Sequence, residues 1–282
     1  MSRSFLRSSA AFVGLFLPVI APALGDPADA PAVAQTNFKL DAGGGEVASQ
    51  GLGYLQGSFS APLGHSFGLQ VDGAAGDWDH KSFGSVSGHL FWRDPSEGLF
   101  GLYGTYLASG VPDLRIFDVG SGTVTTSGHS SLYRGGAEAE LYLGQWSLEG
   151  RVGFEGEAIG GTHFFDRANV AFYPGDDFRL AVGQIYTGDR DHGSLTAEYQ
   201  VSDRLGLTLF AEGVTGDHST SVFGGLRFYF GDPGKPLIGR QREDDPGVSI
   251  PEDLLGIAAG VKHKTTTCRN NEGTIIPCNI KD

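Results

Sequence analysis

The feature that most constrains this chain is a series of about twelve segments, each about ten residues long, in which apolar and polar residues alternate. The series covers residues 35–231, and Gly-rich or Asp-rich breaks separate its members. Successive side chains of a β-strand point to opposite faces. In the last segment, therefore, Val222, Leu226 and Phe228 share one face, while Phe223 and Arg227 share the other. Each segment is predicted to be a strand with one apolar face and one mixed, charged face.

The breaks between the segments alternate in length. Those after even-numbered segments are short, at residues 63–65, 94–98, 144–145, 173–176 and 202–203. Those after odd-numbered segments are longer, at residues 43–50, 74–81, 156–162, 187–192 and 214–219, and the longest runs from about residue 108 to residue 130. Short turns at one end and long loops at the other are typical of a barrel that spans an outer membrane. An even strand count places both ends of the barrel on the short-turn side.

Charged residues occupy the predicted polar face of most segments, interleaved with Gly, Ser and Thr. They are Lys39, Asp41, Asp72, Arg134, Glu138, Glu140, Glu149, Arg151, Glu155, Arg167, Arg179, Glu198, Glu212 and Arg227. In a closed barrel the apolar face meets lipid, the charged face lines the lumen, and every strand edge is paired. The sequence therefore predicts an all-β fold, a closed antiparallel transmembrane β-barrel of about twelve strands with a flexible C-terminal extension. The alternative is a soluble sandwich or lipocalin-like barrel whose apolar face points inward.

The last segment carries the most specific motif, Gly-Leu-Arg-Phe-Tyr-Phe at residues 225–230. With this motif, residues 35–231 resemble the Gram-negative outer-membrane β-barrels of the porin-like family. The motif is similar to the last-strand signal that the barrel-assembly machinery reads in that family, with Gly225, Phe228 and Phe230 in its defining positions. The family usually ends its chain at the terminal aromatic residue, whereas residues 232–282 follow here. The resemblance implies a location in the outer membrane, in contact with lipid and lipopolysaccharide.

Both ends of the chain fall outside the barrel series. Residues 1–34 are predicted to be a secretory signal and short leader, with Arg3 and Arg7 before a short apolar run and small-residue cleavage motifs at 23–25 or 32–34. Residues 232–282 are expected to form a mostly flexible periplasmic tail, with one short helix beginning near Pro251. The alternatives are that the tail folds back to plug the barrel or that it touches peptidoglycan.

Two cysteines, Cys268 and Cys278, lie in this tail and are expected to form a disulfide in an oxidising compartment. Two free thiols, or a bond between chains, are the alternatives. No cofactor is expected.

Acidic residues recur in three of the predicted rim loops, where Asp77, Asp79, Asp189 and Asp191 are weak candidates for a Ca²⁺ or Mg²⁺ site. The favoured interpretation is that Gly-Asp pairs are good turn formers, because the Asp side chain bonds its own backbone. Asp79, Asp191 and His192 also suggest a hydrolase on the rim, with a His–Asp pair as general base. His89 has no suitable serine partner in the sequence, which argues against a phospholipase-like nucleophile.

The net charge of −13 excludes a nucleic-acid partner, which needs a basic surface. The lumen charges favour passive, porin-like passage of small polar solutes or ions, since opposed charges across a lumen orient solutes and set ion selectivity. The chain is not expected to be an enzyme. The alternative function is a closed structural or surface-interaction barrel, and the rim hydrolase is a third.

Overall fold

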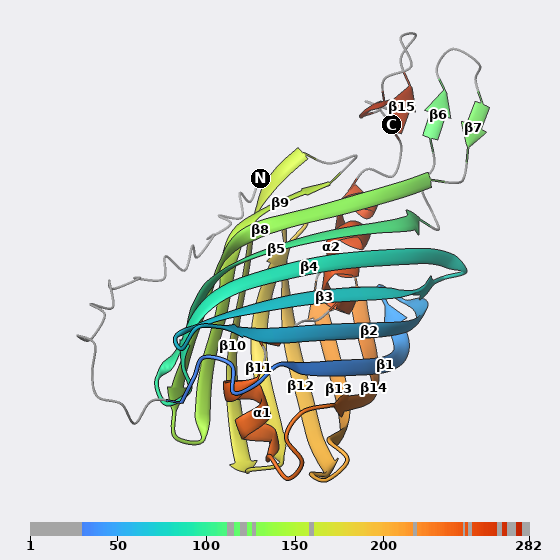
Figure 1. Ribbon diagram of the computed structural model, residues 1–282. Helices are drawn as coiled ribbons and strands as arrows, with labels where there is room; N and C mark the ends of the chain where they lie inside the picture. The colour runs from blue at the N-terminus through green and yellow to red at the C-terminus, as the bar shows by residue number, and fades with distance from the viewer. Residues whose placement is uncertain are drawn as a thin grey trace, which may run out of the picture.

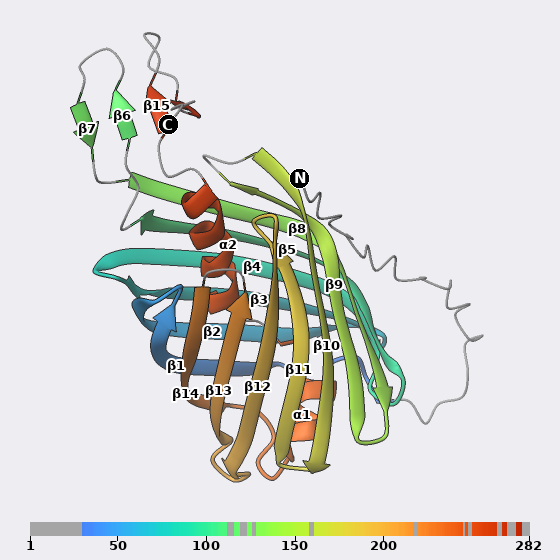
Figure 2. The ribbon, with the colours of Figure 1, turned by 180° about the vertical axis from the view of Figure 1, so that it is seen from behind.

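The computed structural model describes residues 30–111, 116–118, 123–125, 128–157, 161–216, 219–244, 246–247, 250–263, 267–269 and 275–277. Within these residues, twelve antiparallel strands close into one barrel (Figures 1 and 2). They are β1 (Asn37–Val47), β2 (Gln50–Leu63), β3 (Phe67–Trp78), β4 (Lys81–Asp94), β5 (Gly98–Val111), β8 (Gly128–Leu143), β9 (Trp146–Glu157), β10 (Gly161–Gly175), β11 (Phe178–Thr187), β12 (Arg190–Ser202), β13 (Leu207–Gly216) and β14 (Ser219–Tyr229). Each strand pairs with its neighbours along this series, and β1 pairs with β14 to close the sheet.

The outer face of the barrel is apolar over the whole circumference. Large side chains such as Leu55, Phe154, Val182 and Val222 are more than half exposed there. Leu148 and Val170 also point outward, whereas the neighbouring Glu149 and Asn169 face the lumen. An apolar exterior around a closed set of backbone hydrogen bonds is what a bilayer requires. The predicted transmembrane barrel is confirmed, and the soluble alternative with an apolar interior is wrong.

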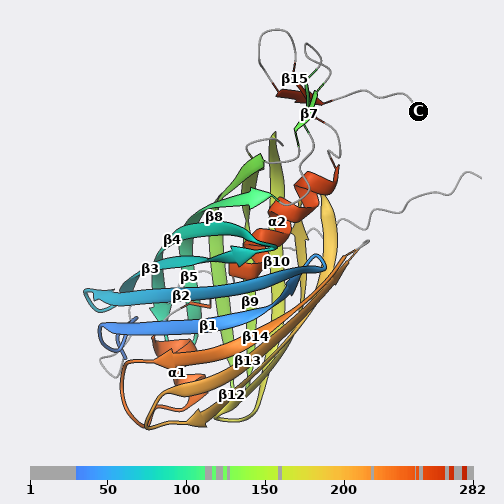
Figure 3. The same ribbon diagram turned by 90° about the vertical axis from the view of Figure 1, so that its right-hand side faces the viewer.

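The two ends of the barrel are built differently. At one end, here called the turn end, β1 begins and β14 ends, as Figure 3 shows. At the opposite end, here called the loop end, lies the long connection between β5 and β8. Both chain ends of the barrel therefore lie at the same end, as an even strand count requires, and away from the long β5–β8 connection.

Most of the predicted long loops are strand. The prediction of loops at residues 43–50, 74–81 and 187–192 is wrong, because the strands continue to two-residue turns. Ala48 and Ser49, and Asp79 and His80, form two of these turns with positive φ angles, as type I′ hairpin turns require. Glycine has a low strand propensity, so the Gly-rich stretch at residues 43–46 suggests a loop. In the structure this stretch pairs with both β2 and β14, which gives its backbone groups hydrogen-bond partners.

Two helices follow the barrel in sequence, α1 (Leu237–Glu243) and α2 (Ile250–His263). In Figures 1 and 2, α1 lies at the turn end of the barrel and α2 lies inside it towards the loop end. No helix in the described part of the chain is long and apolar enough to cross a membrane.

A small second sheet lies beyond the loop end (Figure 1). It contains β6 (Ile116–Asp118), β7 (Thr123–Thr125), β15 (Thr267–Arg269) and β16 (Ile275–Pro277). Strand β15 of the C-terminal tail pairs in parallel with β6, which belongs to the connection between β5 and β8. The tail thus leaves β14 at the turn end and meets the barrel chain again at the loop end.

Residues before β1 also contribute to the turn end. Ala32 and Val33 are fully buried, and Val33 packs with Phe91 and Leu99. The Ala34 amide donates to the carbonyl of Glu243 in α1. A signal cut at residues 23–25 would keep this segment in the mature chain, whereas a cut at residues 32–34 would remove it.

Candidate functional site: the occupied lumen

The fourteen residues predicted to line the lumen all lie on the inner side of the barrel. Nine of them are buried: Lys39, Asp41, Asp72, Arg134, Glu138, Glu155, Arg179, Glu198 and Glu212. The other five line an internal cavity: Glu140, Glu149, Arg151, Arg167 and Arg227. That they serve a conducting pore stays a prediction.

Several of these charges form ion pairs within the wall. Arg227 donates to both carboxylate oxygens of Asp41, each at 2.8 Å, and to Glu198 at 3.0 Å. Arg179 donates to Glu149 at 2.6 Å. Such bidentate, charge-assisted bonds are short and directional. These bonds fix side chains within a charged belt, which consists of the fourteen lumen-lining residues named above. The belt occupies the middle of the lumen and its turn-end side.

His89 lies between two carboxylates of this belt. Its Nδ1 is 2.9 Å from Glu138 Oε1, and its Nε2 is 3.4 Å from Asp72 Oδ2. Both ring nitrogens therefore face acidic partners, and the imidazole stacks on Tyr103. A serine nucleophile needs a ring nitrogen free to take its proton, so this histidine lacks the arrangement of a Ser–His hydrolase.

Two cross-strand pairs in the belt bring like charges together. Arg151 on β9 stands directly opposite Arg167 on β10, and Glu140 on β8 stands directly opposite Glu149 on β9. Like charges in this register destabilise a sheet unless a counter-charge neutralises them. Arg179 supplies that charge to Glu149 from within the wall.

Within the arginine pair, Arg151 has a counter-charge in the wall, Glu138 at 3.3 Å, and Arg167 takes its counter-charge from the tail. Glu252 of α2 forms an ion pair with Arg167, and the adjacent Asp253 forms one with Arg134. Arg151 donates to the carbonyl of Gly247, just before the helix. The sequence predicts a mostly flexible periplasmic tail, with plugging of the barrel as an alternative. Residues 237–244 and 250–258 instead plug the barrel, which is the alternative.

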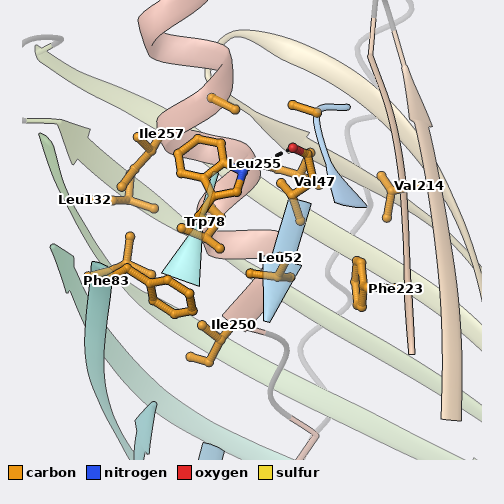
Figure 4. Close-up of a cluster of buried hydrophobic side chains, with 14 of the residues drawn as sticks. Val47, Leu52, Trp78, Phe83, Leu132, Val214, Phe223, Ile250, Leu255 and Ile257 are labelled. Atoms are coloured by element: carbon orange, nitrogen blue, oxygen red, sulfur yellow. Dashed lines mark hydrogen bonds between the residues drawn. The ribbon is translucent and has the colours of Figure 1, made fainter. Parts of the chain in front are cut away.

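Apolar side chains surround α2 on the loop-end side of the belt (Figure 4). This apolar collar consists of Val47, Leu52, Trp78, Phe83, Leu107, Leu132, Phe165, Ile185, Val214 and Phe223 from the strands, packed against Ile250, Leu254, Leu255 and Ile257 of α2. The collar residues stand on the inner face, where the sequence predicts charged residues. Their signal is an apolar side chain at an inward-facing position near the loop end of several strands, as at Leu132, Phe165 and Ile185.

Helix α1 caps the turn end through hydrogen bonds. Arg240 is buried and donates to Gln200 at 2.9 Å and to two backbone carbonyls. Arg242 donates to the carbonyl of Trp146 at 2.9 Å and lies over the rings of Tyr142 and Tyr173. The Ile238 amide donates to the carbonyl of Asp176. These contacts join α1 to the turns themselves.

A cavity of about 80 Å³ remains between the two helices. Its lining combines six wall carboxylates and four wall arginines with Gln241 of α1 and Gly247 of the linker. The space is large enough for a few water molecules, since a water occupies about 30 Å³ in the liquid. The lumen of this structure is therefore filled at both ends, and its charged residues enclose a small polar chamber.

The rim carboxylates do not come together as a metal site. Asp77 accepts a hydrogen bond from the His80 amide at 2.8 Å, and Asp189 lies 2.9 Å from the His163 ring. No group of three possible metal ligands occurs among the described residues. His192 points inward and is buried while Asp191 is exposed on the outer side, so these two residues do not form a His–Asp pair. A rim hydrolase stays a prediction.

The residues of the assembly motif lie at the end of β14. A Cβ atom at Gly225 would stand 2.2 Å from the carbonyl oxygen of Ala42, so this glycine permits the close approach of β1 and β14. Phe228 and Phe230 stack with ring centroids 6.5 Å apart, and Phe230 is exposed. Recognition by an assembly machinery stays a prediction. The cysteine side chains at 268 and 278 lie outside the described residues, and so does the predicted disulfide.

Comparison with solved structures shows the same fold in known barrels. A KdgM porin in complex with disordered oligogalacturonate superposes with a TM-score of 0.50 at 10% identity, covering 68% of this chain and 99% of that one. An outer membrane channel from Pseudomonas putida F1 gives 0.47 at 11% identity, covering 73% and 99%. Outer membrane phospholipase A from Escherichia coli gives 0.43 at 12% identity, covering 73% and 99%. No protein-family model and no curated protein sequence matches the chain.

Proposed function

We propose that the protein is an outer-membrane channel of the porin-like kind, which passes small polar solutes or ions and is held closed by its own C-terminal segment. The observation that carries the proposal is a membrane-exposed barrel whose lumen wall is charged around its circumference. A barrel built only for stability has no need to bury so many ionised groups, because taking charges out of water is costly.

The size of the barrel is compatible with passage once the lumen is cleared. Barrels of about eight strands are filled by their side chains, whereas those of about sixteen hold an open channel. Twelve strands lie between these limits, and the lumen holds a helix at its loop end. Space that accommodates an α-helix, about 10 Å across with its side chains, admits a small hydrated solute. The fold likeness to a porin of the same architecture supports this interpretation.

The membrane orientation follows the convention for such barrels, with the turn end facing the periplasm. In that orientation α1 closes the periplasmic mouth and β15 reaches the outer surface. Lipid and lipopolysaccharide would contact the apolar exterior, and the motif at residues 225–230 would be read during assembly.

Single-channel recording in planar bilayers tests the proposal. Three chains are compared: the full chain, a chain ending at Asp244 that lacks α2, and a chain ending at Asp232 that lacks both helices. We expect rare or no steps from the full chain, small steps from the second and large steps from the third. Heat-modifiable gel migration confirms that each barrel is folded. Folded barrels without any steps in all three preparations would exclude a channel.

A structural or surface-interaction barrel is the second candidate, and the filled lumen favours it. It predicts that removing α1 and α2 leaves the bilayer silent while lowering the stability of the barrel.

A further inference from the structure

Three arginines from neighbouring strands point into one region of the lumen. Arg134 lies on β8, Arg151 on β9 and Arg167 on β10, and the last two are directly opposite one another. Arg134 and Arg151 each have a wall carboxylate, Glu155 at 2.9 Å and Glu138 at 3.3 Å. Arg167 has none: within the described residues, its only ion pair is with the tail. Within the wall, these three guanidinium groups therefore have two carboxylates as ion-pair partners.

The tail supplies two neighbouring carboxylates to this region. Glu252 binds Arg167 and Asp253 binds Arg134, so one short stretch of helix spans from β10 to β8. Gly256, one turn further on, lies against the same wall, where a Cβ atom would stand 2.8 Å from Arg134 Nη2. The side chains of Arg134 and Glu252 are almost fully buried. These contacts are the kind that an anionic ligand makes in a preformed binding site.

We propose that Arg134, Arg151 and Arg167 form a binding site for a soluble polycarboxylate, which Glu252 and Asp253 occupy as an internal competitor. This rests on the proposed function, since the solute must enter the lumen. The guanidinium fork matches a carboxylate in geometry and charge. The site spans two strand spacings, roughly 10 Å, so its ligand carries two or more carboxylates at separated positions. Binding of such a ligand displaces the carboxylates of the tail and favours release of α2 by linkage.

Isothermal titration calorimetry with suberate, a linear dicarboxylate, tests the site on the full chain in detergent at constant ionic strength. The double variant Glu252→Gln, Asp253→Asn removes the competing charges and keeps the shape of the tail. We expect suberate to bind this variant at least ~10-fold more tightly than the unmodified chain, because a competitor has been weakened. Adding Arg151→Gln and Arg167→Gln to the double variant is expected to weaken binding by ~10-fold or more.

Two controls separate the site from general attraction. Arg204→Gln, on an exposed turn outside the lumen, is expected to leave the suberate affinity unchanged. Acetate, a single carboxylate, is expected to bind far more weakly than suberate. Equal affinity in the unmodified chain and the double variant, or binding that survives loss of both arginines, overturns the proposal.

A second measurement covers the case in which a variant fails to fold. Suberate added to the unmodified chain is expected to speed protease cleavage between residues 245 and 258, and unchanged cleavage at saturating suberate contradicts the proposal. Neither readout needs ion flow. A chain that conducts after truncation but does not bind suberate overturns this site alone, while suberate binding without any channel steps overturns the channel alone.

Discussion

Towards the loop end, the inner wall of the barrel is apolar and holds α2 by packing, whereas towards the turn end the wall is charged and holds the tail by ion pairs and hydrogen bonds. The apolar collar makes non-directional contacts, and removing its apolar side chains from water is favourable. The charged belt makes directional contacts, which can be exchanged for a competing ion. The difference suggests that the collar supplies affinity for α2 and the belt supplies the means of releasing it.

The largest effect is expected from a charge placed in the collar. Leu254 is fully buried against the strands, so Leu254→Asp leaves an uncompensated charge there, at a cost of about 3–5 kcal/mol. We expect α2 to leave the lumen, with protease cleavage between residues 245 and 258 rising by more than ~100-fold. Leu254→Met, which conserves volume, is the control and should stay protected. Protection of the Asp variant would show that the collar contributes little.

A larger side chain at Gly256, at the border of the collar and the belt, should weaken the binding of α2 less strongly. Gly256 fits closely against Arg134, Thr187 and Leu132, since a Cβ atom at this residue would lie within 3.1 Å of each of them. Gly256→Leu is expected to weaken seating of α2 by about 1–3 kcal/mol through overpacking. Gly256→Ala brings its Cβ into these same contacts, but the gain in helix propensity of about 1 kcal/mol offsets the crowding, so the protease protection of α2 should change little. The rate of protease cleavage between residues 245 and 258 measures the effect in both variants. An unchanged Leu variant would mean that α2 is loosely held.

The two regions also differ in how well the sequence predicts them. Alternation alone identified the twelve strands, the outward apolar face and the inward charges, because each is a local property of period two. The outward face of β5, with Phe100, Leu102 and Tyr106, is fixed by the partner strands. The loop boundaries failed for a related reason. Gly-rich stretches have weak strand propensity, but closure of the barrel gives them partners on both sides.

The site was predictable only in part. Inward residues such as Leu132 and Phe165 interrupt the charged face, and a strictly polar lumen gives no reason for them. They are explained only by α2, which is about a hundred residues away in sequence. The tail has too little apolar content to form its own core, so it reads as flexible. Residues 250–258 form a helix inside the barrel because the barrel provides the other half of a shared core.

Neutralising one carboxylate of α2 measures how much a single ion pair of the belt contributes to holding the helix. Asp253→Asn removes the charge that faces Arg134, while Glu155 stays 2.9 Å from the same guanidinium. Because that second carboxylate remains, we expect a loss near the lower limit for a bond to a charged group, about 1.5 kcal/mol. Glu252→Gln should cost more, since Arg167 then has no carboxylate partner among the described residues. Protease protection of α2 ranks the two, and the reverse order would contradict the assigned partners.

Salt should give the smallest effect and separate the two kinds of contact most directly. Buried ion pairs are screened less than exposed ones, so raising the ionic strength from about 0.1 M to about 1 M is expected to weaken seating of α2 by less than ~1 kcal/mol. Packing in the collar does not depend on charge, and sodium chloride leaves it nearly unchanged. In the Glu252→Gln, Asp253→Asn variant the salt dependence of α2 protection should therefore vanish, while Leu254→Met should keep it. An equal salt dependence in both variants would assign the effect to α1, whose arginines contact carbonyl groups at the turn end, and would move the releasable contact from the belt to the cap.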